Sequence, residues 1–332
     1  MVYQFYSLAE DKVVSLDKKG SNECGPDNDA KIVGSSHGWL ALFHEHNCDL
    51  FLYNPISGRH IKLPPLSMGN GRLSKIIISS SSPHEEDCRA VITYGPEDRL
   101  AFCCPGRTRS TIEWTLLGDC SSYQYESLAY SSKQKLFFCA RTHDDLEAWN
   151  LRDPLSPRMT PIVVSVEEDS YPLAARSELE LDLKLLCEDY KFLVVAEMSD
   201  ELFHVRRFVM TPMGPDGSDE SVPYMTVGFD VHKYDPETGS LVYMDRSLGG
   251  LVIFIGCNDG FALSTAEFPE LKPNSIYFTD VRSPLEWIVS GYGGHDLGIF
   301  NYQDQTFTSC YYPCDFNNIK RIVPTPMWFT PL

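Results

Sequence analysis

The sequence of 332 residues predicts an all-β fold, a single β-propeller of about six four-stranded blades. Three observations predict it. A hairpin pattern recurs along the chain, and from Ile32 onward short apolar runs alternate with clusters of Gly, Pro, Asn, Asp and Ser. These runs also fall into groups of three or four, the number of strands in a propeller blade.

The recurring hairpin is strongest at residues 49–64, where an apolar strand ends in an aromatic residue and is followed by Asn, a tight turn and a second strand. Weaker copies, with Asn or Asp after the aromatic residue, lie at residues 148–154, 232–241 and 298–307. Such repetition over a chain of this length is typical of small antiparallel sheets arranged around an axis.

The grouping of the runs sets the domain boundaries. Residues 1–30 form an N-terminal segment, a loop that contains at most one strand, and residues 31–332 form the propeller. The first and last units are each one strand short, so we expect the two chain ends to share a blade and close the ring without a free sheet edge. The expected units are residues 31–66, 73–118, 123–166, 179–233, 238–280 and 286–313.

Two acidic stretches interrupt this pattern. Residues 167–169 lead into residues 177–188, where leucine occupies every second position from Leu179 to Leu185 and predicts a strand. Residues 212–220 form a loop rich in Pro, Gly and acidic residues, which we interpret as a solvated insertion rather than a binding element.

Composition predicts a globular intracellular protein, located in the cytoplasm, the nucleus or both. Hydrophobic residues make up 43% of the chain, yet no apolar run approaches the length that spans a bilayer. The N-terminus lacks the basic start and apolar core of a secretory signal. The 11 cysteines, an odd number spread over the whole chain, indicate reduced and mostly buried thiols.

The net charge of −18 limits the possible partners. Binding to nucleic acid depends largely on Lys and Arg that neutralise phosphates, and an acidic chain is repelled by polyanions. Nucleic acid and anionic membrane are therefore excluded as expected partners, and a basic protein surface is favoured.

Residues 34–38, Gly-Ser-Ser-His-Gly, match the G-x-S-x-G pattern of a hydrolase nucleophile elbow. That chemistry requires a sharp turn from a strand into a helix, where backbone N–H groups form an oxyanion hole. Residues 39–43 instead predict a strand. We therefore interpret the motif as a turn that enters a strand of the first blade.

His44, His46 and Cys48 could face one side of an extended strand and bind zinc, but they lie where a hairpin tip is expected. Cys310 and Cys314 are too far apart for a C-x-x-C site.

Cys103 and Cys104 are the end of a strand. The Gly-rich residues 291–296 precede a strand, whereas a phosphate-binding loop would open a helix, so we interpret them as a loop between strands.

The tryptophans divide into two groups. Four lie in predicted strands and are assigned to the core between blades: Trp39, Trp114, Trp149 and Trp287. The segment 324–331 is too rich in proline for a central strand, so we expect Trp328 and Phe329 to lie across the propeller and fasten the ring.

Several segments together resemble the plant F-box proteins whose C-terminal region is a KIB-type β-propeller. The matching segments are residues 33–40, 52–58, 63–65, 272–280, 296–300 and 328–331. Their order along nearly the whole chain makes the resemblance fairly specific.

The resemblance implies an F-box that binds the SKP-type adaptor of a cullin ubiquitin ligase, and a propeller that presents the substrate. Some members of the family bind GSK3-like kinases in brassinosteroid signalling. An F-box needs a helical, Leu-Pro-led segment of about 45 residues, and residues 1–30 show no such pattern.

We therefore expect a non-enzymatic, monomeric protein-interaction propeller that resembles a ubiquitin-ligase substrate-recognition domain and docks a kinase or another signalling protein. The sequence indicates no cofactor and assigns no catalytic, metal-binding or partner-binding residue. The alternative is a propeller hydrolase or lyase, which would need several His, Asp or Glu side chains to converge in the central channel.

Overall fold

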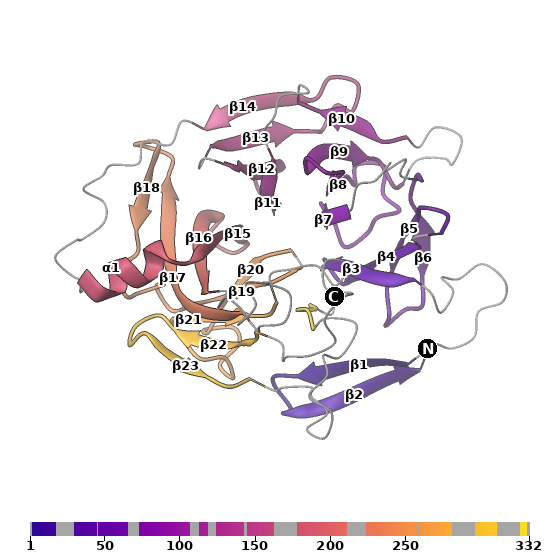
Figure 1. The fold of residues 1–332 in the computed structure, drawn as a ribbon. Coiled ribbons are helices and arrows are strands. Elements are labelled where there is room, and N and C mark those ends of the chain that lie inside the picture. The colour runs from indigo at the N-terminus through magenta and orange to yellow at the C-terminus, as the bar shows by residue number, and fades with distance from the viewer. Residues whose placement is uncertain are drawn as a thin grey trace, which may run out of the picture.

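The computed structural model arranges short sheets around a common centre (Figure 1). Its described residues contain 23 β-strands and one α-helix. They are residues 2–17, 30–44, 46–65, 73–106, 113–118, 124–142, 145–162, 178–210, 224–257, 259–280, 296–310 and 326–330.

Three four-stranded antiparallel sheets follow one another along the chain and around the ring (Figure 1). The first meander contains β3 (Lys31–Ser36), β4 (Trp39–His44), β5 (Asp49–Tyr53) and β6 (His60–Lys62). The second meander contains β7 (Leu73–Ile78), β8 (Ala90–Tyr94), β9 (Arg99–Cys103) and β10 (Thr115–Leu117). The third meander contains β11 (Tyr125–Ser131), β12 (Leu136–Arg141), β13 (Leu146–Asn150) and β14 (Arg158–Ile162). These meanders match the first three expected units.

The remaining strands of the ring form one sheet of nine strands. A fourth meander contains β15 (Glu188–Ala196), β16 (Glu201–Met210), β17 (Met225–Asp235) and β18 (Ser240–Tyr243). A terminal group contains β19 (Leu251–Ile255), β20 (Phe261–Ser264), β21 (Ser275–Phe278), β22 (Gly298–Asn301) and β23 (Thr306–Thr308). The expected boundary between residues 233 and 238 is wrong, because the turn there keeps β17 paired with β18 from Asp235↔Ser240 onward.

The fourth meander and the terminal group are joined between β15 and β20. These strands are parallel and share two residue pairs, Val195↔Phe261 and Ala196↔Ala262. Gly260 makes this close approach possible, because a β-carbon there would lie 3.0 Å from Val194 Cγ2. Two of the expected sheets are therefore one continuous sheet.

The N-terminal segment contains two strands where the sequence predicted one at most. β1 (Val2–Ser7) and β2 (Lys12–Asp17) pair as an antiparallel hairpin from Ser7↔Lys12 outward. Glu10 N donates to Ser7 Oγ at 3.2 Å, and Asp11 adopts a positive φ of 48° that closes the turn. The predicted loop at residues 18–30 lies outside the described residues except for Ala30.

The recurring sequence hairpin is the outermost hairpin of a sheet in all four places, namely β5–β6, β13–β14, β17–β18 and β22–β23. The residue after the aromatic position accepts backbone N–H bonds in every copy. These residues are Asn54, Asn150, Asp235 and Asn301. An Asx side chain that caps a turn explains why this residue type recurs.

The strand predicted at residues 177–188 is wrong, because most of this segment forms α1 (Glu178–Leu185). Glu, Leu and Lys all favour the helix over the strand, and these residue types dominate the segment. Lys184 in the last turn reaches Asp230 of β17, with Nζ 3.0 Å from Oδ1. Residues 163–177, including the acidic stretch before the helix, and the loop at 212–220 lie outside the described residues.

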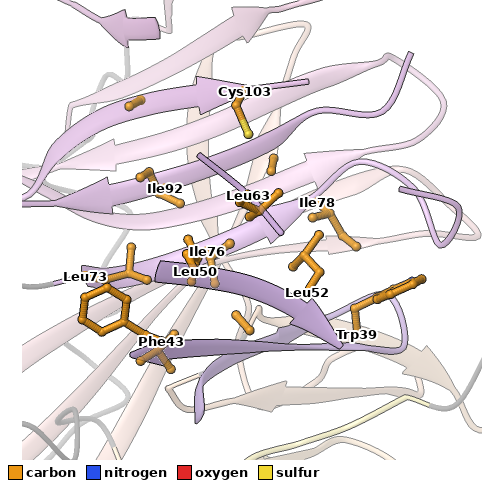
Figure 2. Close-up of a cluster of buried hydrophobic side chains, with 14 of the residues drawn as sticks. Trp39, Phe43, Leu50, Leu52, Leu63, Leu73, Ile76, Ile78, Ile92 and Cys103 are labelled. Atoms are coloured by element: carbon orange, nitrogen blue, oxygen red, sulfur yellow. The ribbon is translucent and has the colours of Figure 1, made fainter. Parts of the chain in front are cut away.

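A buried apolar cluster fills each joint between successive meanders, and a further cluster lies between the fourth meander and the terminal group. Figure 2 shows the joint between the first two meanders, where Trp39 and Leu52 lie beside Ile76, Ile78 and other residues of the second meander. Burying an aliphatic side chain of this kind stabilises the fold by about 1.5–3 kcal/mol. The all-β propeller prediction is confirmed.

The tryptophan assignments are mostly confirmed. Trp39 in β4 and Trp149 in β13 are buried in joints between sheets. Trp114 is not in a strand but directly precedes β10, and it packs on the first joint while its indole N–H donates to Pro64 O at 2.9 Å. Trp287 lies outside the described residues.

Candidate functional site

One edge of the ring brings together turns from all four meanders. Successive turns of an antiparallel meander alternate between its two edges, so the first and third turns share an edge. Contacts between meanders identify this turn edge: Lys133 Nζ donates to Met198 O at 2.6 Å, and Gln134 Nε2 donates to Asp200 Oδ2 at 2.8 Å.

The turn between β3 and β4 lies at the centre of this edge. His37 and Gly38 both have positive φ, 49° and 77°, as in the mirror-image turns that suit hairpins. β4 begins at Trp39, so no helix follows the G-x-S-x-G motif. The interpretation of this motif as a turn into a strand is confirmed.

Ser36 is the hub of a polar cluster at the end of β3, here called the mouth cluster: Ser36, His37, Lys75, Glu197, Cys257 and Asp259. Ser36 Oγ accepts the backbone N–H of Ile78 at 3.1 Å. The same oxygen lies 3.0 Å from His37 Nδ1 and 3.1 Å from Asp259 Oδ2. Asp259 is held in place by its own backbone, whose N–H donates to Ser35 O at 3.2 Å.

The electrostatics of the mouth cluster are dominated by burial. Burial raises the pKa of Asp259 to about 7, although the Ser36 hydroxyl and the Lys75 ammonium oppose the shift and Glu197 adds to it. Burial lowers the pKa of Lys75, whose Nζ lies 4.8 Å from the centre of the Phe192 ring. The Cys257 thiol is neutral, because burial raises its pKa to about 12.

His37 connects the cluster to the fourth meander. Its Nε2 lies 3.8 Å from Glu197 Oε1 in the turn between β15 and β16. Burial lowers the pKa of His37, and the neighbouring carboxylate opposes this shift only in part. The imidazole is therefore neutral near pH 7, with a nitrogen facing each neighbour.

This arrangement differs from a hydrolytic triad in one decisive respect. In a triad the acid holds the histidine and the histidine holds the nucleophile. Here the acid beside His37, Glu197, lies 3.8 Å away and beyond hydrogen-bond distance, while Asp259 contacts Ser36 and Ser36 Oγ already accepts a backbone N–H. The cluster suits structural hydrogen bonding and proton exchange better than nucleophilic attack.

The C-terminal segment reaches the same region. Trp328 donates from its indole N–H to Ile255 O at 3.1 Å, and its own carbonyl accepts a hydrogen bond from Ser35 Oγ. Its ring packs edge-on against Phe254 and Tyr277, with centroids 5.2 and 6.0 Å apart. Residues 326–330 therefore contact both the first meander and the terminal group.

A buried arginine ties the second meander to the third. Arg89 donates to four backbone carbonyls at 2.8–2.9 Å, and two of them, Leu151 O and Arg152 O, belong to the third meander. These bonds use four of the five N–H donors of the guanidinium, so its role is structural.

The other candidate residues are not brought together. β4 ends at His44 and β5 begins at Asp49, so His46 and Cys48 lie in the predicted hairpin tip. His44 instead packs edge-on against Phe51, with ring centroids 5.6 Å apart. In the part of the chain that the structure describes, no three His, Cys, Asp or Glu side chains gather as a metal site.

Cys103 ends β9 and is buried beside Cys104, as predicted for a strand end, and burial raises the pKa of Cys103. Cys310 directly precedes residues that are not described, among them Cys314. Of the Gly-rich stretch only Asp296 is described, and its Oδ2 pairs with Arg207 Nη2 at 3.0 Å.

Sequence reasoning missed Lys75, Glu197 and Asp259. One signal was available, because Lys75 is the single charged residue in β7, where four of the six residues are apolar. Glu197 and Asp259 carry no motif, and only the packing of sheets that are distant in the sequence brings them to His37 and Ser36.

The described residues include no helix with the length and apolar character needed to cross a bilayer.

Comparison with known proteins gives one extensive match. A family model described as the KIB1-4 beta-propeller matches residues 5–301. The F-box protein At2g17690 of Arabidopsis thaliana is 43% identical over 63 residues, which cover 19% of this chain and 15% of that protein.

The solved structures that match this chain have low TM-scores and low sequence identity. The Cps50 (Swd1) β-propeller domain from Myceliophteria thermophila has a TM-score of 0.38 and 9% identity, covering 85% of this chain and 73% of that one. The Dos1 propeller has a TM-score of 0.36 and 9% identity, and the match covers 84% of this chain and 60% of that one. A puromycin hydrolase has a TM-score of 0.35 and 13% identity, and the match covers 86% of this chain and 47% of that one.

Proposed function

Because the chain belongs to the KIB1-4 β-propeller family, we propose that it is a non-enzymatic protein-interaction domain that presents a partner protein. The observation that carries this proposal is the match of the family model over residues 5–301. The similarity of a 63-residue segment to an F-box protein supports a substrate-recognition role in a ubiquitin ligase. Sequence resemblance makes a GSK3-like kinase the first candidate partner.

The turn edge is the surface that we assign to docking. It carries three well-exposed apolar side chains, Ile56, Leu155 and Met198, each in a turn of a different meander. Exposed apolar residues on rigidly held turns are suitable anchors for a protein partner, because burying them on binding adds affinity. The net charge of −18 favours a partner with a basic contact surface.

Biolayer interferometry with an immobilised GSK3-like kinase tests the proposal. We expect micromolar or tighter binding, weakened about tenfold or more, or ~1.4 kcal/mol, by Ile56→Ser, Leu155→Ser and Met198→Ser together. The control combines Asn47→Ser and Glu97→Ser on the opposite edge and leaves binding unchanged.

Absence of binding at about 100 μM, which corresponds to roughly −5 kcal/mol, refutes the kinase as partner. Equal binding by the apolar variant and the control refutes the turn edge. Tight binding of a purified SKP-type adaptor instead would contradict the expectation that residues 1–30 hold no F-box.

The alternative function, a propeller hydrolase or lyase, has one observation in its favour, the contact of Ser36 Oγ with His37 Nδ1. A fluorophosphonate probe tests it, since an activated serine reacts while a hydroxyl held by hydrogen bonds does not. Labelling that is lost in Ser36→Ala would support the enzyme and refute the adaptor.

We further propose that the ring has about six blades and is closed by the two chain ends. The contacts of Trp328 with the first meander and the terminal group support closure, as does the packing of Phe5 of β1 against Phe329 at 5.1 Å between ring centroids. In this proposal the β1–β2 hairpin belongs to the sixth blade.

The protein is proposed to act as a monomer in the cytoplasm, the nucleus or both. The odd number of cysteines, 11 over the whole chain, supports an intracellular location. A fluorescent fusion at the C-terminus tests the location, and light scattering of the purified chain tests the monomer.

A further inference from the structure

A row of hydrogen-bonding groups crosses the turn edge from the terminal group to the fourth meander. It runs from the Asp259 carboxyl through Ser36 Oγ to the His37 ring and ends at the Glu197 carboxylate. The three contacts measure 3.1, 3.0 and 3.8 Å. The first meander thus meets two distant parts of the nine-stranded sheet along one row of side chains.

The Ser36 hydroxyl in the middle of the row limits the directions that its hydrogen bonds can take. A serine oxygen has one hydrogen and two lone pairs. One lone pair of Ser36 Oγ is taken by the backbone N–H of Ile78. One hydrogen and one lone pair are left for two neighbours, so one neighbour must donate to Ser36 and the other must accept from it.

Two arrangements satisfy this rule. When Asp259 is protonated, its carboxyl donates to Ser36, Ser36 donates to His37 Nδ1, and the imidazole proton lies on Nε2, facing Glu197. When Asp259 is ionised, Ser36 donates to the carboxylate and His37 donates from Nδ1. The Nε2 lone pair then faces the Glu197 carboxylate, which is repulsive.

We propose that this row is a proton switch, in which one proton taken up from solvent by Asp259 selects the tautomer of His37 and thereby makes the contact of His37 with Glu197 attractive, the held state, or repulsive, the released state. The held state exists when Asp259 is protonated. In the released state the turn at residues 197–200 stays attached to the third meander through Lys133 and Gln134, so the change is confined to the side chains of His37 and Glu197.

The groups around Asp259 bring its pKa, and therefore the midpoint of the switch, close to neutral pH. Of the groups facing Asp259, Ser36 and the Lys75 ammonium of β7 lower its pKa, and Glu197 raises it, while burial is the largest effect and brings it to about 7. His37 stays neutral in this range because burial lowers its pKa.

More distant groups complete the environment. Glu126 of β11 and Asp98 of the β8–β9 turn face Lys75, and both help to keep it charged. Cys257 is neutral, and the carbonyl of Asp280 accepts a hydrogen bond from its thiol at 3.1 Å.

The backbone N–H of Asp259 donates to Ser35 O at 3.2 Å and keeps the loop against β3 when the charge appears. Gly260 lies against β15 so closely that a β-carbon would be 3.1 Å from Leu193 O. The ionised carboxylate therefore remains in the row, and the change is transmitted to His37.

Nitrogen-15 spectra of the histidine rings test this inference on the whole chain. With His37 assigned by His37→Gln, we expect the proton on Nε2 at pH 6 and on Nδ1 at pH 8, with the ratio changing about tenfold per pH unit around a midpoint near 7. Asp259→Asn, whose amide donates to Ser36 at every pH, keeps the Nε2–H tautomer throughout. Glu197→Gln shifts the midpoint to lower pH.

The matched control is Asp153→Asn, an exposed aspartate on the same edge, which leaves the midpoint unchanged. A single His37 tautomer across the range in the unmodified chain overturns the inference, and so does an imidazolium at pH 6. These outcomes are read on the unmodified chain, with His37→Gln used only for assignment, so a misfolded Asp259→Asn protein would not obscure the result. They are also independent of which partner the turn edge binds.

Discussion

Replacing Trp328 with alanine tests whether the C-terminal segment fastens the ring. Complete burial makes a Trp→Ala substitution cost about 3–5 kcal/mol, and Trp328 is half-buried, so the loss of packing against Phe254 and Tyr277 is about 2 kcal/mol. Losing the indole N–H bond to Ile255 O adds about 0.5–1 kcal/mol. The free energy of unfolding should therefore fall by about 2–3 kcal/mol.

Thermal unfolding followed by calorimetry measures this effect. In a chain of this size about 1 kcal/mol moves Tm by roughly 2 °C, so we expect a decrease of about 4–6 °C. Trp328→Phe, which keeps a ring but loses the N–H, should lower Tm by about a third of that. Leu155→Ala, at a side chain that is 89% exposed, is the control and should leave Tm unchanged. If Trp328→Ala behaves like this control, the segment does not fasten the ring.

Two further substitutions probe the joints between sheets by the same assay. Gly260→Ala should lower the free energy of unfolding by about 1–3 kcal/mol, because its β-carbon would meet β15, whereas Gly228→Ala has 3.8 Å of room and should cost less than about 1 kcal/mol. Arg89→Lys should cost about 2–4 kcal/mol, since an ammonium cannot serve four carbonyls in the plane of a guanidinium. The exposed Arg59→Lys is its control, and equal Tm values for either pair would contradict the reasoning.

The propeller could be predicted because its signal is local and repeated. An aromatic residue followed by Asn or Asp marks the outermost hairpin of a sheet, and the side chain of Asn54 caps the turn through bonds to two successive N–H groups. The helix α1 could not be recognised from leucine spacing, because alternation of period two argues for a strand while the residue types favour a helix. The contact of Lys184 with Asp230, which no local pattern reveals, accompanies the helical conformation.

The mouth cluster was only partly predictable. The sequence identified the turn at residues 34–38 and correctly rejected an elbow, since a strand follows it. Lys75, Glu197 and Asp259 come from strands and turns that are far apart in the chain, and each is a single side chain without a motif. Their meeting around Ser36 and His37 is a property of the tertiary packing, so it could be seen only in three dimensions.

The hydrogen bonds between β15 and β20 give the ring an uneven stiffness. Nine strands belong to one hydrogen-bonded sheet, so we expect them to move together. The first three meanders contact their neighbours chiefly through side chains, so we expect each of them to move more independently. Amide exchange should accordingly be slowest in β15 and β19. The first three meanders are the part of the ring that can adapt its shape to a bound molecule.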